Sequence, residues 1–243
     1  MTKLSLTGYP HINNLPLYAE RTVHYDSEKV EEHEHDFHEM VIVQKGSGCH
    51  VIDDRMLNIS TGDIFIVSPG HQHYYKNIEH LTLLNILFDP EILDFVKNDM
   101  LNIPGFHLFF KTSDELSSEK RNDEKMHIDE ESLSEIMRIF NNIIEEQNNL
   151  RSGSMTFILT SFIQLILLIC RKSNFHDQGY YSHSHQISKA INYMENNYSR
   201  KITLADLAEI SGLSGSSFRR CFYNALGISP INYLMKLRLR KAA

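Results

Sequence analysis

The stretch 204–222 has the residue pattern of a helix-turn-helix, and it constrains the fold of the chain more than any other feature. Its apolar positions recur at three- and four-residue steps, and the small Ala208 follows Leu207 where a second helix would cross closely. Gly212 stands where a tight turn needs a residue with a positive φ. Ser214 is a favourable N-cap for a following helix. The sequence therefore predicts two short helices joined by a tight turn.

The second of these helices carries a basic outer face. Phe218 and Phe222 lie four residues apart, so they are expected to face inward together. The outward positions are then Ser216, Ser217, Arg219 and Arg220. A helix with two adjacent outward arginines can enter a major groove, bond guanine edges and neutralise phosphates. The alternative is an ordinary helical hairpin with a solvated basic face.

Charge is distributed unevenly along the chain. The net charge is −7, but residues 183–243 hold nine of the 24 Lys and Arg residues and three of the 31 Asp and Glu residues. An acidic body followed by a basic tail is typical of a DNA reader attached to a module with another role. Lys201 and Lys236, in this tail, are expected to contact phosphates.

Cysteine usage and hydropathy indicate a cytoplasmic location. The three cysteines, Cys49, Cys170 and Cys221, show no metal-ligand spacing, so we expect them to be reduced thiols. The first residues lack an apolar core long enough for a signal peptide. The most apolar run, Met155–Cys170, has 16 residues, whereas a membrane span needs about 20. We therefore expect no membrane association and interpret this run as a buried helix.

Short apolar segments separated by turn residues fill the region from Val23 to Phe88. They recur at roughly ten-residue spacing, and each ends at Gly, Pro, Asp or Ser residues such as the turn pair Asp53–Asp54. This pattern predicts a small antiparallel barrel or jelly roll. A short helix over Glu91–Met100 and a polar surface loop over Thr112–Asp129 are expected to follow it.

Two sets of spaced residues stand out on this predicted barrel. The first set contains His33, His35, Glu39 and Gly46, and the second contains Gly62, Pro69, Gly70, His73 and Asn77. His33 and His35 lie two residues apart on a strand and point the same way, and Glu39 keeps that parity. The two sets resemble the double motif of the cupin barrel. Two departures are Ser27, where the first motif has glycine, and a Pro-Gly pair displaced by one residue.

Three interpretations of His33, His35, Glu39 and His73 remain open. Histidines with a carboxylate can hold a first-row metal, which with open positions would allow oxygenase or isomerase chemistry. The same groups can bind a sugar or another small polar molecule through hydrogen bonds. They can also be strand-end residues without a ligand. We expect a small organic ligand and no required metal, with these four residues as metal ligands if an ion is present.

Helices follow the barrel. Apolar residues at three- and four-residue steps predict one helix over Ser132–Leu150, and Met155–Cys170 is apolar nearly all round, so it must bury more than one face. One face can lie on the barrel and another on a second subunit, which predicts a homodimer through residues 132–170. A single-chain core that covers both faces is the alternative. The polar stretch after Arg171 reads as a linker.

The segments His33–Gly48 and Ile202–Ala242 together resemble the AraC/XylS family of bacterial transcription regulators, particularly its L-rhamnose-responsive activators. The resemblance implies a cupin-like sugar sensor, dimerisation through the helices after the barrel, and an activator that contacts RNA polymerase. It also implies that Ser216, Arg219 and Arg220 contact bases. The family's DNA-binding domain has two helix-turn-helix units joined by a long helix. This chain ends within that joining helix, so the domain is expected to be incomplete.

The sequence thus predicts a mixed α and β protein with four parts. They are a cupin-like barrel with its following short helix and loop over 1–128, a helical dimerisation segment over 129–172, a linker over 173–183, and an all-α helix-turn-helix domain over 184–243. The predicted function is a ligand-responsive regulator of transcription that binds promoter DNA and is not an enzyme. The alternative is a metal-dependent cupin enzyme with an accessory helical tail.

Overall fold

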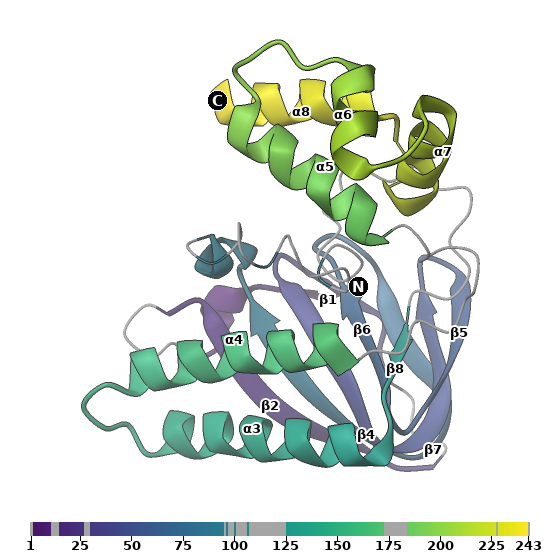
Figure 1. Ribbon diagram of the computed structural model, residues 1–243. Coiled ribbons are helices and arrows are strands. Elements are labelled where there is room, and N and C mark those ends of the chain that lie inside the picture. Colours follow the sequence, from purple (N-terminus) through teal and green to yellow (C-terminus); the bar gives the residue numbers. More distant parts are fainter. Residues whose placement is uncertain are drawn as a thin grey trace. The chain divides into compact units, whose positions relative to one another are not determined.

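The computed structural model describes residues 2–10, 15–26, 30–94, 96, 100, 106, 125–172, 184–226 and 228–242 (Figure 1). The chain forms two compact units. The first, the sensor unit, consists of Met1–Asp94 and Arg121–Asn174. The second, the DNA-binding unit, contains the C-terminal helices α5 to α8.

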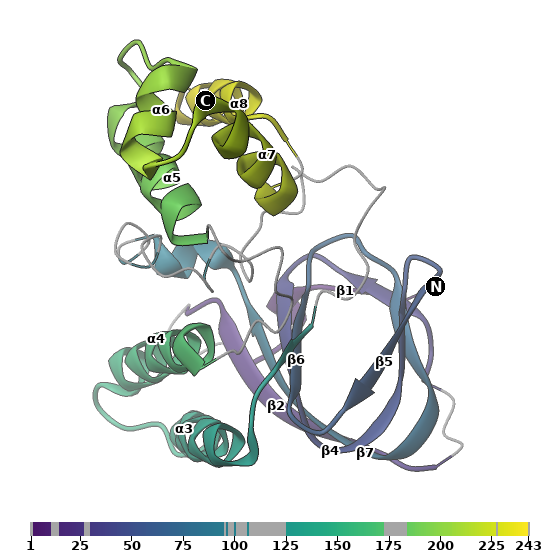
Figure 2. The same cartoon turned by 45° about the vertical axis from the view of Figure 1, so that its right-hand side comes forward.

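The sensor unit is built on one eight-stranded sheet that curls on itself (Figure 2). Its strands are β1 (Thr2–Leu4), β2 (Leu17–His24), β3 (His33–His35), β4 (His38–Ile52), β5 (Arg55–Ser60), β6 (Asp63–Val67), β7 (His73–Phe88) and β8 (Met126–His127). The long strands β4 and β7 pair antiparallel; β2 and β3 pair with β7, and β5 and β6 pair with β4. The predicted antiparallel barrel is confirmed.

Two backbone features shape strand β4: a tight turn that follows it and an irregularity within it. Asp53 and Asp54 both have positive φ, 45° and 65°, which is the conformation of a two-residue hairpin turn between β4 and β5. Gly46 has a φ of 91°, and a Cβ at this position would lie 2.3 Å from the carbonyl oxygen of His80. The register between β4 and β7 shifts here, so glycine allows the two strands to cross closely at an irregularity.

The two faces of the curled sheet bury different side chains. The inner face holds an apolar cluster that includes Val41, Val43, Phe65 and Leu83. On the outer side, Gln147 of α3 exchanges two 3.0 Å hydrogen bonds with the backbone of Ala19 in β2. The side chain of Arg21 donates a 2.7 Å hydrogen bond to Asn141 of the same helix. Because successive strand residues point to opposite faces, Ala19 and Arg21 face the helix and Glu20 between them faces the interior.

Two antiparallel helices cover the outer face of the sheet, α3 (Glu130–Asn148) and α4 (Ser154–Lys172) (Figure 1). The N-cap of α3 is Asp129, whose carboxylate accepts a 2.8 Å bond from the Ser132 amide. By length and composition α4 could cross a membrane. Its fully buried Ile158, Phe162 and Leu165 show instead the packing of a core helix.

The predicted segments after the barrel differ from the structure in part. The 3₁₀ helix η2 (Pro90–Leu93) begins the region predicted as a helix over Glu91–Met100, most of whose remainder lies outside the described residues. The predicted loop Thr112–Asp129 ends in strand β8, which pairs with β6, so the loop assignment is wrong there. Lys125 and His127 both bind the buried Asp63, at 2.7 and 2.9 Å, and this holds β8 in place. The linker 173–183 lies outside the described residues.

The sensor unit also contains a second 3₁₀ helix, η1 (Leu6–Gly8).

The DNA-binding unit contains the helices α5 (Ser184–Asn197), α6 (Leu204–Ser211), α7 (Gly215–Leu226) and α8 (Pro230–Ala242). The core of the helical unit contains Met194, Leu207, Phe218, Phe222 and Leu237, each fully buried. The rings of Phe218 and Phe222 lie 5.4 Å apart, as their four-residue spacing on α7 predicts.

Candidate functional site

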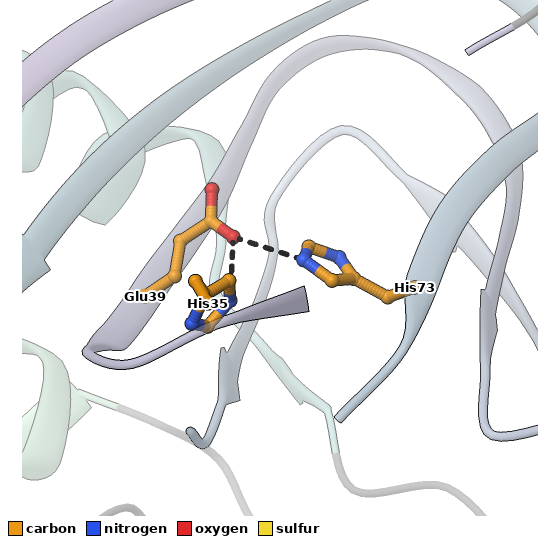
Figure 3. A group of neighbouring side chains, drawn as sticks. All are labelled: His35, Glu39 and His73. Carbon is orange, nitrogen blue, oxygen red and sulfur yellow. Dashed lines mark ion pairs between the residues drawn. The ribbon is translucent and has the colours of Figure 1, made fainter. Parts of the chain in front are cut away.

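Three of the four predicted barrel residues converge inside the sensor unit (Figure 3). His35 ends β3, Glu39 is the second residue of β4 and His73 begins β7. The Nε2 atoms of His35 and His73 lie 3.5 and 3.6 Å from the same carboxylate oxygen of Glu39. All three side chains are buried, with exposed fractions of 1%, 7% and 1%.

The three facing atoms have no hydrogen-bond partner. They are Nε2 of His35, Oε2 of Glu39 and Nε2 of His73. A charge-assisted N–H···O bond has a length of about 2.7–2.9 Å, so separations of 3.5 and 3.6 Å leave the carboxylate without a bonded donor in this cluster. Buried polar atoms are nearly always paired, and each unpaired one costs about 1–3 kcal/mol. The cluster therefore presents three unpaired polar atoms to one another in the interior of the sensor unit.

Backbone carbonyls fix the orientation of two histidine rings. Nδ1 of His35 lies 2.7 Å from the carbonyl oxygen of Phe37, and Nδ1 of His33 lies 3.0 Å from that of Glu31. A carbonyl oxygen only accepts, so both Nδ1 atoms carry the proton, and in the neutral ring Nε2 keeps its lone pair. His33 is half-buried, with its ring 4.3 Å from that of His73, but it is not one of the three converging residues.

His50, which is not part of the two sequence motifs, contacts the ring of His73. Nε2 of His50 lies 3.3 Å from Nδ1 of His73, and the His50 ring stacks between Phe65 and Tyr75, at 4.7 and 4.9 Å. Burial, followed by repulsion from neighbouring histidines, lowers the pKa of His50 to about 3 and that of His73 to about 2. Both imidazoles are therefore neutral at physiological pH.

Further polar residues face the same interior, and the sequence did not identify them. Glu20 of β2 lies opposite Asn85 of β7 in the register of the sheet, and both alternate with residues that face the helices. The amide oxygen of Asn85 is buried without a partner. Burial, followed by the charge of Glu39, raises the pKa of Glu20. Burial and both glutamates raise the pKa of Tyr9 to about 12. Glu20, Glu39 and Tyr9 are thus close enough to influence one another electrostatically.

The helix-turn-helix has well-formed caps. Thr203 accepts a hydrogen bond from the Asp206 amide, and the Asp206 carboxylate accepts one from the Thr203 amide, which together make a capping box for α6. Gly212 ends α6 with a φ of 67°, as predicted for the turn. Ser214 accepts a bond from the Ser217 amide and is the predicted N-cap of α7.

The predicted DNA-contacting residues differ in their accessibility. Ser216, Arg219 and Arg220 are exposed on one face of α7. The exposed Tyr223, one turn further along, extends this face and was missed because aromatic residues in a helix usually predict the core. Ser217 is half-buried, and its hydroxyl and amide both interact with Ser214, so it belongs to the cap of α7.

The predicted phosphate contacts lie outside α7. Lys201 is exposed in the segment before α6, and Lys236 is exposed on α8. Arg238 has a structural role: its Nε and Nη2 donate 2.7 Å hydrogen bonds to the carbonyl oxygens of Tyr198 and Arg200. These carbonyls follow the C-terminal end of α5, where a cation and its donors are favourable.

Comparison with known proteins identifies both units. The AraC-like ligand binding domain model matches residues 20–165, and the model of bacterial regulatory helix-turn-helix proteins of the AraC family matches residues 194–235. The chain is 29% identical to the HTH-type transcriptional activator RhaR of Mannheimia succiniciproducens, over 87% of this chain and 71% of that protein. It is 30% identical to the activator RhaS of the same species, over 87% of this chain and 73% of that protein. RhaS of Enterobacter sp. is 25% identical, over 87% and 72%.

The chain belongs to the AraC family of bacterial regulatory helix-turn-helix proteins. It is a ligand-responsive, DNA-binding regulator of transcription, with a β-rich ligand-binding unit followed by a helical DNA-binding unit. The family and its named activators identify a regulator and not the alternative cupin enzyme.

Proposed function

We propose that the interior of the sensor barrel binds the effector, and that His33, His35, Glu39 and His73 contribute to this site together with Glu20 and Asn85. The observation that carries the proposal is the set of buried polar atoms without partners on His35, Glu39, His73 and Asn85. A bound molecule with several donors and acceptors would satisfy these atoms and offset the free-energy cost of burying them unpaired.

The chemistry of these residues supports an uncharged polyhydroxylated effector such as a sugar. The interior polar groups are carboxylates, imidazoles, an amide and tyrosine hydroxyls, which are either acidic or neutral. A carboxylate or phosphate on the effector would meet Glu20 and Glu39, and like charges at close range are unfavourable. Sugar hydroxyls can donate to carboxylates and to the unprotonated Nε2 atoms of the imidazoles. The resemblance to L-rhamnose-responsive activators points to the same class.

We further propose that this cytoplasmic regulator acts as a homodimer and as an activator that contacts RNA polymerase at its promoter. The activator role is supported by the names of the relatives. Dimerisation within 132–170 is supported by the outer side of α4, where Leu159, Ile163 and Leu167 recur every four residues and remain partly exposed. An apolar stripe of this kind is typical of a surface that meets another protein.

On the DNA-binding unit, Ser216, Arg219 and Arg220 are proposed to contact bases. They occupy the exposed face of α7, the second helix of the helix-turn-helix, which is the helix that enters the major groove in such motifs. Lys201 and Lys236 are proposed to contact phosphates, and Ser217 is proposed to contribute through the cap of α7.

A thermal-shift screen tests the effector proposal. Neutral sugars including L-rhamnose are compared with sugar acids and sugar phosphates, and a sugar at 100 times its dissociation constant should stabilise the protein by about 2.7 kcal/mol. Glu20→Gln and Asn85→Leu should weaken the stabilisation by the sugar that binds. The matched control is Glu79→Gln, since Glu79 is an exposed carboxylate of β7 that binds Ser47. An effector that stabilises both interior variants as strongly as the parent places the site elsewhere.

A further inference from the structure

We propose that Tyr223 on α7 contacts the 5-methyl group of a thymine in the major groove, and that this contact adds a base preference to those of the arginines. The side chain of Tyr223 is 58% exposed, whereas the other described tyrosines and phenylalanines of the DNA-binding unit are buried or half-buried. The inference rests on the proposed function, in which α7 enters the major groove, and it extends the set of base-contacting residues beyond the serine and the arginines.

Helical geometry places Tyr223 in the middle of the face that carries the proposed base contacts. Successive residues of an α-helix are about 100° apart around its axis. Relative to Tyr223, Ser216 lies about 20° away around the axis of α7. Arg219 lies about 40° to one side of Tyr223 and Arg220 about 60° to the other. The four side chains therefore share an arc of about 100°, and the two arginines form its borders.

The packing of the DNA-binding unit does not require an aromatic residue at position 223. The preceding residue, Phe222, is fully buried, and its ring lies 5.4 Å from that of Phe218 and 5.7 Å from that of Tyr233. Tyr233 donates a 3.3 Å hydrogen bond to Glu195, whereas the hydroxyl of Tyr223 has no hydrogen-bond partner among the described residues. A single exposed aromatic residue is ordinary on a protein surface, so the position of Tyr223 among the proposed base contacts is what gives its exposure a meaning.

Thymine is the base whose major-groove edge suits this side chain. The edges of the base pairs present nitrogen and oxygen acceptors and amino donors in that groove, and the 5-methyl group of thymine is the apolar group among them. The body of a tyrosine ring is apolar, and at the centre of the α7 face it is directed at the bases. Arg219 and Arg220 favour guanine, which offers two acceptors to one guanidinium. Tyr223 therefore adds a different base to the recognised sequence.

The length of the tyrosine side chain fits its place along the helix. In helix-turn-helix proteins, residues near the N-terminus of the second helix contact the base edges. Tyr223 lies about 10 Å further along α7 than Ser216, so a base contact from this position requires a long side chain. Tyr223 and Arg219 are about 6 Å apart along the axis, and neighbouring base pairs are about 3.4 Å apart. The thymine is therefore expected one or two base pairs from the base that Arg219 contacts.

Replacement of thymine by uracil tests this contact, because uracil lacks only the 5-methyl group and keeps the base pair. The full chain first selects a DNA site from a random duplex pool, and each thymine of that site is then replaced in turn. The parent protein should lose affinity about fourfold at one or two positions, which corresponds to the burial of one methyl-sized group. Tyr223→Ala should bind the unmodified site at least about fourfold more weakly than the parent and should not distinguish thymine from uracil at those positions.

Two further variants serve as controls. Tyr223→Phe should keep the parent's response to uracil, because the ring makes the contact and the hydroxyl does not. Met235→Ala is the matched control, since Met235 is similarly exposed, at 56%, but lies on α8. It should respond to uracil like the parent. A cooperative thermal transition in every variant will show that each is folded.

The uracil series separates this inference from the proposed contacts of the arginines. If the parent binds every uracil duplex as tightly as the unmodified site, or if Tyr223→Ala keeps the parent's response at every position, the inference is overturned. A Tyr223→Phe variant that binds weakly, with no response of the parent to uracil, would indicate a hydroxyl contact to a phosphate and overturn it as well. In each of these cases Arg219→Ala and Arg220→Ala should still lose affinity, which leaves the proposed function intact. Arginine variants that bind like the parent would instead contradict the proposed function, and this inference with it.

Discussion

The ring of Phe162 on α4 packs against the ring of Phe88 on β7, with centroids 5.0 Å apart. Both side chains are fully buried, so this contact joins the helix to the outer face of the barrel. The apolar character of α4 therefore has two sources. One face contributes to the core of the sensor unit, and the stripe formed by Leu159, Ile163 and Leu167 remains partly exposed.

This division predicts different outcomes for two positions on one helix. Leu167→Glu should weaken the proposed dimer while the monomer stays folded, because the side chain is half-exposed. Phe162→Ala should instead lower the free energy of unfolding by about 3–5 kcal/mol, as a large cavity would form. Sedimentation velocity measures the first effect and denaturant titration the second. Gln164→Glu, at an exposed polar position of α4, controls for the added charge. A parent protein that sediments as a monomer contradicts the dimer.

The exposed arginines of α7 should carry sequence discrimination. Arg219→Ala and Arg220→Ala are each expected to weaken binding to a DNA site selected from a random duplex pool by about 1–3 kcal/mol, because contacts to base edges are lost. Lys201→Ala should weaken binding to all sequences alike and reduce the salt slope by about 1. Titrations at several salt concentrations distinguish the two effects. If both arginine variants bind the selected DNA site as tightly as the parent, α7 does not contact the bases.

Arg238 is also basic, but its substitution should affect the stability of the DNA-binding unit more than its contacts with DNA. Its guanidinium holds the carbonyls of Tyr198 and Arg200 after α5, so Arg238→Ala should destabilise the DNA-binding unit by about 1–2 kcal/mol. Arg238→Lys should recover only part of this, because lysine lacks the fork of donors. The thermal midpoint of the DNA-binding unit is the measurement. A loss of DNA affinity with an unchanged midpoint would indicate a phosphate contact instead.

Local features of the sequence were sufficient to predict much of this structure. The turn at Asp53–Asp54 and the caps at Ser214 and Gly212 depend on residues within a few positions of one another, and the structure has them as predicted. The same is true of the buried pair Phe218 and Phe222. For these elements, backbone sterics and hydrogen bonding within a turn decide the conformation.

The barrel site could be predicted only in part. The parity argument placed His33, His35 and Glu39 on one strand, but the chain leaves β3 after His35 and Glu39 belongs to β4. Glu20 has no local sequence signal that marks it as a residue of the site. Closure of the sheet makes its face of β2 the interior, and the pairing of Glu20 with Asn85 depends on a register between distant strands. The contact between His50 and His73 likewise joins residues that are distant in the sequence.

The cysteines provide a last test, since Cys221 lies on α7, the helix proposed to contact bases. Cys49 and Cys170 are buried in the sensor unit, and burial raises the pKa of the Cys170 thiol to about 12. The thiolate is the reactive form, so Cys170 should remain unreactive in native protein even at mildly alkaline pH. Cys221 is half-buried on α7, beside Arg220. A disulfide reagent such as DTNB should therefore modify Cys221 first, and Cys221→Ser should abolish the fast phase. Bound DNA should slow this phase if α7 lies in the groove. A fast phase with the same rate in the presence of saturating specific DNA would contradict that placement.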